Sequence, residues 1–307
     1  MPRVDVCVIT YQRPNSLRRL LEGIQRLEPP APGFEVRVVI VDNDGGGSAR
    51  EVCDEAAGCL RWPLVYLTEE QRGIPYARNA ALAASLPEAD FVAFVDDDEV
   101  PDPGWLVALL QAQDEYQADA VTGPVDPVFD TPPPRWIVDS GLFDAARRPT
   151  GATMQTAYTN NVLIAKRALV DMEALFDETM ALIGGGDSEL FERFARRHRI
   201  VWCDAARVRE HIPPSRARLA WLVRRALRIG TSRTLVDRLH SRRPRDLARI
   251  VANGGWCLAK GSTLALLGLA RGRGAAARGL FLACVGFGRI VGLTGWTYEE
   301  YRTIHGS

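Results

Sequence analysis

The stretch FVAFVDDDE at residues 91–99 decides the fold. Its five apolar residues predict a buried β-strand, and the carboxylates of Asp96 to Asp98 follow at the strand's end. Three similar runs precede it, at residues 4–10 (VDVCVIT), 35–41 (EVRVVIV) and 64–67 (LVYL). Helical spacing occurs between and after these runs, at residues 16–26, 48–57, 74–86 and 104–116. The alternation predicts an α/β fold with a mostly parallel, doubly wound sheet, in which ligands bind at the carboxyl ends of the strands.

Beyond residue 123 the pattern is less regular. Residues 124–158 are rich in Pro, Asp and Thr, which predicts a long irregular excursion from one core. Strand-like runs follow at residues 160–165 and 200–203, and the glycine-rich IGGGD precedes another helical segment at residues 183–187. From residue 215 the spacing is helical and rich in arginine. We therefore expect one α/β domain over residues 1–235 and a helical, apolar extension over residues 236–307.

The composition is that of a globular protein with a substantial core. The chain has 307 residues, of which 47% are hydrophobic and 25% charged, and this excludes a disordered or disulfide-stapled miniprotein. Its zero net charge hides an asymmetry: residues 1–190 hold 15 Lys and Arg against 31 Asp and Glu, and residues 191–307 hold 23 against 7. The six cysteines are scattered without zinc spacing, and no signal-peptide pattern opens the sequence. We expect a cytoplasmic protein.

Two groups of carboxylates follow predicted strands and are candidates for binding. Three adjacent carboxylates at Asp96 to Asp98 repel one another, and a divalent cation such as Mg²⁺ or Mn²⁺, completed by a substrate's phosphates, offsets that repulsion. Asp42 ends the second strand, where it can accept a hydrogen bond from a base or a ribose hydroxyl. Ordinary turn chemistry is the alternative in both places. The glycine motifs of dinucleotide and P-loop sites are absent from the sequence.

Five motifs occur in an order that resembles a known family. They are VCVITYQRP at residues 6–14, VIVDN at 39–43, RGIPYARNA at 72–80, FVAFVDDDE at 91–99 with PGWL after it, and GGGDSEL at 184–190. The sequence resembles family 2 glycosyltransferases over about residues 4–230, especially bacterial members that build exopolysaccharides. The resemblance implies a GT-A fold, a nucleotide-diphosphate sugar donor with UDP as the commonest nucleotide, an activating Mg²⁺ or Mn²⁺ and inversion at the anomeric carbon.

The resemblance also implies roles for individual residues. Its donor-binding positions fall on Thr10, Tyr11 and Arg13 beside the nucleotide, Asp42 at the base, Gly73, Arg78 and Asn79 on one loop-to-helix segment, and Asp96 and Asp97. The family's Asp-x-Asp motif makes Asp98 the expected metal ligand, and His211 is a second candidate ligand of metal or diphosphate. A structural role is the alternative for His211.

Asp187 matches the position where inverting members carry the general base. An acceptor hydroxyl has to lose its proton as it attacks the sugar, and a carboxylate at the start of a helix, after three glycines, suits that task. The sequence departs from the family pattern at Gly186, where Glu is usual, which puts neighbouring acceptor contacts in doubt. A plain helix N-cap is the alternative for Asp187.

The C-terminal third offers two further features. Arginines recur at Arg216, Arg218, Arg224, Arg225, Arg228 and Arg233, where they suit phosphate groups, pairing with the acidic front, or solvent. No Gln-x-x-Arg-Trp motif surrounds Trp221, and processive members usually have one, so transfer of a single sugar is expected.

Residues 246–296 are apolar with sparse cations, which favours either a place on the inner face of the membrane or packing on the core or on a second subunit. We expect a glycan or lipid-linked acceptor and no nucleic-acid partner. The competing functions are a nucleotidyltransferase-type enzyme that uses the same carboxylates and an inactive GT-A scaffold.

Overall fold

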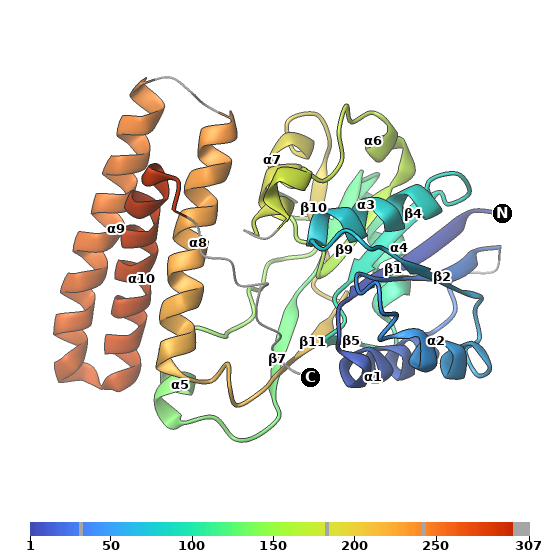
Figure 1. The fold of residues 1–307 in the computed structure, drawn as a ribbon, viewed down its shortest axis with the longest axis horizontal. Helices are drawn as coiled ribbons and strands as arrows, with labels where there is room; N and C mark the ends of the chain where they lie inside the picture. Colours follow the sequence, from blue (N-terminus) through green and yellow to red (C-terminus); the bar gives the residue numbers. More distant parts are fainter. Residues whose placement is uncertain (31–32, 182–183, 241–243, 297–307) are drawn as a thin grey trace.

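The computed structural model describes residues 1–30, 33–181, 184–240 and 244–296 (Figure 1); Ile183 of the glycine-rich motif lies outside them. Within these residues an eight-stranded sheet runs in the order β3-β2-β1-β4-β9-β6-β10-β8. The four strands expected in the first hundred residues are all present and parallel, as β1 (Arg3–Thr10), β2 (Glu35–Asp42), β3 (Leu64–Thr68) and β4 (Phe91–Val95). The second half of the sheet is mixed, with β6 (Ala120–Thr122), β8 (Thr153–Met154), β9 (Asn161–Ala165) and β10 (Ile200–Trp202).

Side-chain alternation along the strands builds a core on each face of the sheet. In β1, Val4, Val6 and Val8 pack on one face, whereas Cys7 packs on the other. The first face is covered by α1 (Pro14–Gln25), α2 (Arg50–Ala57) and α4 (Trp105–Tyr116). The second is covered by α3 (Ile74–Ser85), α6 (Lys166–Val170) and α7 (Gly186–Phe194). The carboxyl ends of the parallel strands are therefore fixed from both sides, and the expected sheet is confirmed.

A small second sheet lies beside the end of β4. It contains β5 (Glu99–Pro101), β11 (Val208–Ile212) and β7 (Val125–Phe129), with β11 in the middle. Glu210 lies opposite Glu99 in the register of β11 and β5. The stretch expected to be irregular, residues 124–158, therefore contributes β7, α5 (Arg135–Ser140) and β8. Strands as short as β7 and β8 show too little alternation to be predicted from the sequence, and their partner strands are far away along the chain.

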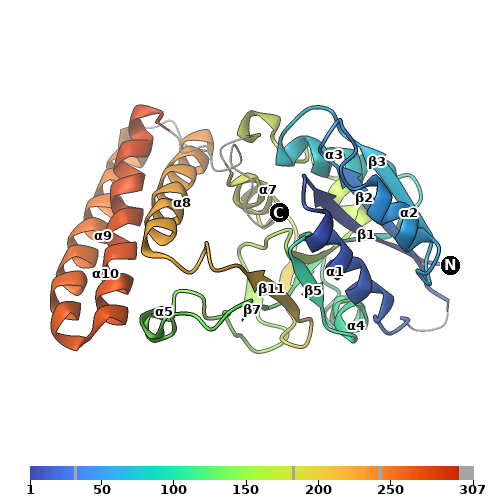
Figure 2. The ribbon, with the colours of Figure 1, turned by 60° about the horizontal axis from the view of Figure 1, so that its bottom comes forward.

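The C-terminal region is a three-helix unit of α8 (Leu219–His240), α9 (Pro244–Arg271) and α10 (Arg273–Val291), followed by η2 (Gly292–Thr294) (Figures 1 and 2). The expected boundary between residues 235 and 236 lies inside α8, which packs on α10 with its whole length on the helical side of the molecule. Arg273–Thr294 is the one helical segment among the described residues that is long and apolar enough to cross a membrane, and a third of its most apolar stretch is buried.

Glycines let α10 approach both neighbours closely. A Cβ atom on Gly261 of α9 would lie 2.2 Å from the backbone nitrogen of Ala283, and one on Gly230 of α8 would lie 2.3 Å from the carbonyl oxygen of Val285. The glycines that interrupt the apolar pattern are thus helix-packing positions. The faces of α9 and α10 that carry these glycines therefore pack within the chain.

Candidate active site

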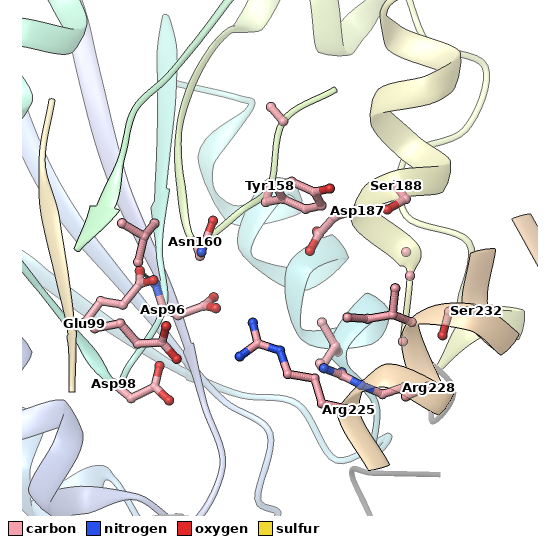
Figure 3. Close-up of a pocket in the computed structure, with 18 of the residues that line it drawn as sticks. Asp96, Asp98, Glu99, Tyr158, Asn160, Asp187, Ser188, Arg225, Arg228 and Ser232 are labelled. Carbon is pink, nitrogen blue, oxygen red and sulfur yellow. Dashed lines mark hydrogen bonds between the residues drawn. The ribbon is translucent and has the colours of Figure 1, made fainter. Parts of the chain in front are cut away.

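The carboxyl ends of β1 and β4 open into a cavity of about 1050 Å³. Its lining joins the sheet to the helical unit: Thr10, Arg78, Asp98 and Asp187 lie on one side, and Arg225 of α8 lies on the other. Figure 3 shows side chains from the strand end, from α7 and from α8 pointing into this one space. The acidic first half of the chain and the arginine-rich second half therefore meet across the cavity.

Asp97 is anchored at the sheet. Its Oδ2 accepts a hydrogen bond of 2.8 Å from the Oγ1 of Thr10, and its Oδ1 lies 3.0 Å from Nη1 of Arg13. Asp97 is buried, so both contacts replace water that the carboxylate has lost. Thr10 and Arg13 thus hold the middle of the acidic run, and they line the same cavity.

Asp98 faces two arginines. Its Oδ2 accepts a bond of 2.9 Å from Nη2 of Arg216 and lies 3.4 Å from Nη1 of Arg13. Arg216 also donates from Nη1 to Glu210 at 2.8 Å. The pairing of C-terminal arginines with the acidic front is therefore real at this position.

The carboxyl groups of the acidic cluster lose their protons less readily than free carboxyl groups do. Burial raises the pKa of Asp96 to about 7, against the opposing charge of Arg78, and the neighbouring carboxylates raise it further. Burial likewise raises the pKa of Asp97 to about 6 and that of Glu99 well above its ordinary value. Crowded carboxylates of this kind bind a cation readily, because the cation removes the repulsion between them.

Asp187 lies in the first turn of α7 and is held by two donors. Nη1 of Arg78 lies 2.6 Å from its Oδ1, and the Oγ1 of Thr159 donates to the same oxygen at 3.0 Å. Arg78 is itself buried and places Nη2 3.9 Å from Asp96. One guanidinium thus links the base candidate to the acidic cluster, and both hydrogen bonds that described residues give Asp187 go to Oδ1 and not to Oδ2.

The loop before α3 reaches the cavity through Gly73. Its backbone N–H donates to Oδ1 of Asn43 at 2.8 Å, and its φ of 151° is a conformation that favours glycine. A Cβ atom here would lie 2.6 Å from Cβ of Ala181. Tyr11 lines the cavity beside this loop, with the guanidinium of Arg72 4.7 Å from its ring centre.

Three of the expected site residues do not line the cavity. Asp42 is fully buried, and its oxygens accept bonds from the N–H groups of Asp44 and Ala49 and from the hydroxyl of Tyr66. Asn79 exchanges two hydrogen bonds with the backbone of Phe176.

His211 turns its imidazole toward Asp130, with Nδ1 3.0 Å from Oδ1, while its backbone N–H donates to the carbonyl of Asp98. Its strand position on β11 explains this, because side chains alternate along a strand and Glu210 takes the direction of the acidic cluster. Asp42 thus stabilises the turn that follows β2, and Asn79 holds the loop at Phe176. His211 pairs with Asp130 and belongs to a strand.

Four further residues of the site carry no signal in the sequence. Glu210 lines the cavity and accepts a bond from Arg216, whereas Thr159 lies outside the lining and donates to Asp187. Tyr158 and Asn160 line the cavity from the chain before β9, with Tyr158 beside Asp187 (Figure 3). Their segments carry no motif and reach the cavity only through long-range strand pairing.

The donor set fits a divalent ion of the Mg²⁺ or Mn²⁺ type. Asp96 and Asp98 offer hard carboxylate oxygens at one end of the cavity, and Asp96 is more than a third exposed there. The described residues contain no ready-made group of three or more His, Cys, Asp or Glu ligands. Such ions keep several positions for water and for substrate phosphates, so two carboxylates are a sufficient protein contribution.

Comparison with known proteins identifies the family. The model of the family described as Glycosyl transferase family 2 matches residues 5–175. The chain belongs to glycosyltransferase family 2. It is 30% identical over 258 residues to the succinoglycan biosynthesis protein ExoM of Rhizobium meliloti (strain 1021), covering 83% of this chain and 82% of ExoM.

Solved structures agree with this family at the level of the fold. The mannosyltransferase PcManGT from Pyrobaculum calidifontis, in complex with GDP-Man and Mn²⁺, superposes with a TM-score of 0.62 and 19% identity, covering 94% of this chain and 87% of that one. S. aureus TarS 1-349 in complex with UDP superposes with a TM-score of 0.56 and 18% identity, covering 97% and 93%. The fold is GT-A, and the family 2 protein is a glycosyltransferase. The nucleotidyltransferase alternative loses its basis.

Proposed function

We propose that this family 2 protein transfers a single sugar, with inversion and with a divalent metal, from a nucleotide-diphosphate donor to a hydroxyl of a glycan or lipid-linked acceptor. The observation that carries the proposal is the placement of Asp187 and Asp98 on one cavity, in which Arg78 contacts both Asp187 and Asp96. UDP is the first nucleotide to test. ExoM is named for succinoglycan biosynthesis, which supports a polysaccharide or glycoconjugate product.

The residues divide the reaction between the two ends of the cavity. Asp187 accepts the proton of the acceptor hydroxyl on Oδ2, while Arg78 and Thr159 fix Oδ1. The acceptor oxygen forms a bond to the anomeric carbon as the bond from that carbon to the diphosphate oxygen breaks, and the diphosphate leaves with the electron pair. Asp96 and Asp98 would hold the Mg²⁺ or Mn²⁺ that stabilises the charge of the leaving diphosphate.

Exposed side chains at the tip of the α9–α10 hairpin support the proposal that the protein lies on the inner face of the membrane. Leu264, Leu266, Leu267 and Leu269 are exposed on the last turns of α9, and Arg271 and Arg273 are exposed beside them. Exposed leucines next to arginines suit an anionic lipid surface, where the apolar side chains enter the acyl boundary and the cations meet the headgroups. A lipid-linked acceptor would be reached from there.

Nucleotide binding and transfer test the proposal in two steps. Thermal shift with UDP, GDP, dTDP, CMP and ADP, each with Mn²⁺ or EDTA, is expected to give a Mn²⁺-dependent rise with one nucleoside diphosphate. Asp98→Ala removes that rise, while Asp187→Asn keeps it and abolishes transfer. Asp54→Asn, an exposed carboxylate on α2, is the matched control. A protein that binds none of the nucleotides is the inactive scaffold, and full transfer by Asp187→Asn contradicts the base.

A further inference from the structure

The arginines of residues 216–233 fall into two groups in the structure. Arg216, Arg225, Arg228 and Arg233 line the cavity, whereas Arg218 and Arg224 are exposed and lie outside its lining. On α8, Arg225 and Arg228 are three residues apart and share a face, and Arg224 points elsewhere although it is the adjacent residue. The helical unit therefore presents selected cations to the cavity.

Arg225 is directed toward the acidic end. Its guanidinium lies over the indole of Trp221, 5.0 Å from the ring centre, and Trp221 stacks on Phe143 at 6.0 Å and 13°. Figure 3 shows Arg225 extending from α8 toward Asp96 and Asp98. Its charge also opposes the burial that raises the pKa of Glu210, the carboxylate that shares Arg216 with Asp98.

A diphosphate held by a metal ion at Asp98 would keep some oxygens that the ion does not bind. A divalent ion of this type takes only some of the diphosphate oxygens as ligands, and those left over need donors from elsewhere. Arg13 and Arg216 approach the acidic cluster from the sheet side, where they contact Asp97, Asp98 and Glu210. A guanidinium fork approaching from the opposite wall matches two phosphate oxygens at once.

We propose that Arg225 of α8 binds the diphosphate of the donor from the helical side of the cavity, opposite Asp98, with Arg228 as the neighbouring cation. The proposal rests on the proposed function and extends it: the helical unit supplies a donor contact in addition to any contact with a membrane. The diphosphate is then held between the sheet and α8, and the sequence resemblance, which assigns donor contacts only to residues before position 212, is incomplete.

Titration calorimetry on the whole chain tests this contact with three probes in Mn²⁺, namely the nucleoside diphosphate that binds the wild type, its monophosphate, and inorganic pyrophosphate. Arg225→Ala is expected to weaken the diphosphate and pyrophosphate about tenfold and the monophosphate much less. Arg225→Lys keeps the charge without the fork and falls between. Arg224→Ala is the matched control and binds like the wild type.

Two outcomes overturn the proposal. Equal affinity of Arg225→Ala and the wild type for all three probes removes Arg225 from the donor site. Unchanged affinity for these probes, with loss of binding to farnesyl diphosphate in detergent micelles, assigns the arginine to a phosphorylated acceptor instead. A wild type that binds no nucleoside diphosphate contradicts the proposed function itself, so the two failures are distinguishable. Melting temperatures of both Arg225 variants show that each is folded.

Discussion

Arg216 places Nη2 2.9 Å from Oδ2 of Asp98, so the carboxylate expected to bind the metal already has a cation as its partner. The arginine comes from the segment just before α8, and the aspartate from the end of β4. A divalent ion at Asp98 has to share this oxygen with Arg216 or displace it. The ion pair is largely shielded from solvent, so the competition is felt more strongly than at an exposed pair.

Replacing Arg216 therefore changes the affinity for the metal. Arg216→Gln is expected to raise the affinity for Mn²⁺ in the absence of nucleotide by roughly three- to tenfold, because a competing charge is removed. Electron paramagnetic resonance of free Mn²⁺ measures this directly, with Arg218→Gln as the exposed control. Weaker binding in the variant would show that Arg216 orients Asp98 and does not compete.

Thr159 is expected to matter for turnover and not for donor binding. Its hydroxyl contacts only Oδ1 of Asp187 among the side chains described, so Thr159→Val keeps the volume and loosens the base. We expect kcat to fall about tenfold, because the variant loses one hydrogen bond to a charged group. Steady-state kinetics and nucleotide titration separate the two effects. Thr153→Val, an exposed residue of β8, serves as control, and a raised donor Kd in Thr159→Val would speak against the assignment.

The carboxyl groups of the acidic cluster predict how stability depends on pH without metal. In the folded protein, loss of water raises the pKa of Asp96 to about 7 although Arg78 opposes the rise, and loss of water with the charge of Asp96 raises the pKa of Glu99 well above its usual range. The folded state thus binds protons that the unfolded chain releases above about pH 4. This stabilisation is complete at low pH and is lost as pH rises through 7.

In EDTA, the melting temperature should accordingly fall between pH 5.5 and 8. Glu99→Gln keeps an acceptor for the N–H of Asp96 and removes one of the titrating groups, so the fall becomes shallower. Thermal shift in EDTA across this range measures both slopes. An identical slope in Glu99→Gln would mean that the proton is bound elsewhere.

Two glycines of α9 offer a matched test of the helical unit. Gly261→Ala puts a Cβ atom 2.2 Å from a backbone nitrogen of α10 and is expected to destabilise the protein by about 1–3 kcal/mol. Gly255→Ala meets nothing within 4 Å and should stabilise the helix by about 0.5–1 kcal/mol. Denaturant unfolding gives both values. A stabilising Gly261→Ala would contradict the close contact of α9 and α10.

The hairpin tip is expected to bind anionic membranes. Leu266→Gln with Leu267→Gln removes two exposed leucines, 69% and 53% accessible, and should reduce co-sedimentation with phosphatidylglycerol vesicles several-fold. Val170→Gln, at 64% exposure on α6, is the control for loss of an exposed apolar side chain. Equal sedimentation of all three proteins would contradict membrane binding by these leucines.

Local signals predicted the parallel half of the fold well. The runs that became β1, β2, β3 and β4 are buried, β-branched and followed by polar residues, so periodicity and position agree. The short strands β5, β7 and β11 were missed, because each is stabilised by partners distant in the sequence. That omission also explains His211: without β11, nothing indicated which of His211 and Glu210 turns toward Asp98.

The candidate site was predictable where chemistry and chain direction coincide. Thr10 and Asp98 lie at strand ends, and Asp187 and Arg78 lie in the first two turns of helices at the same edge of the sheet; the structure brings all four to one cavity. Asp42 also follows a strand, but its oxygens are used by the turn that it starts. Arg225 could not be separated from Arg224 by composition, since only the docking of α8 decides which of the two faces inward.

The course of α8 has a consequence for protein engineering. The helix runs unbroken from the wall of the cavity to the part packed on α10, and Arg289 of α10 pairs with Asp237 near its end at 2.6 Å. A shortened protein that stops at residue 235 would keep every sequence motif and yet lose the support of its own active-site wall. Chimeras that exchange tails between relatives would therefore exchange part of the cavity wall together with the helical unit, and the smallest transplantable part begins before Leu219.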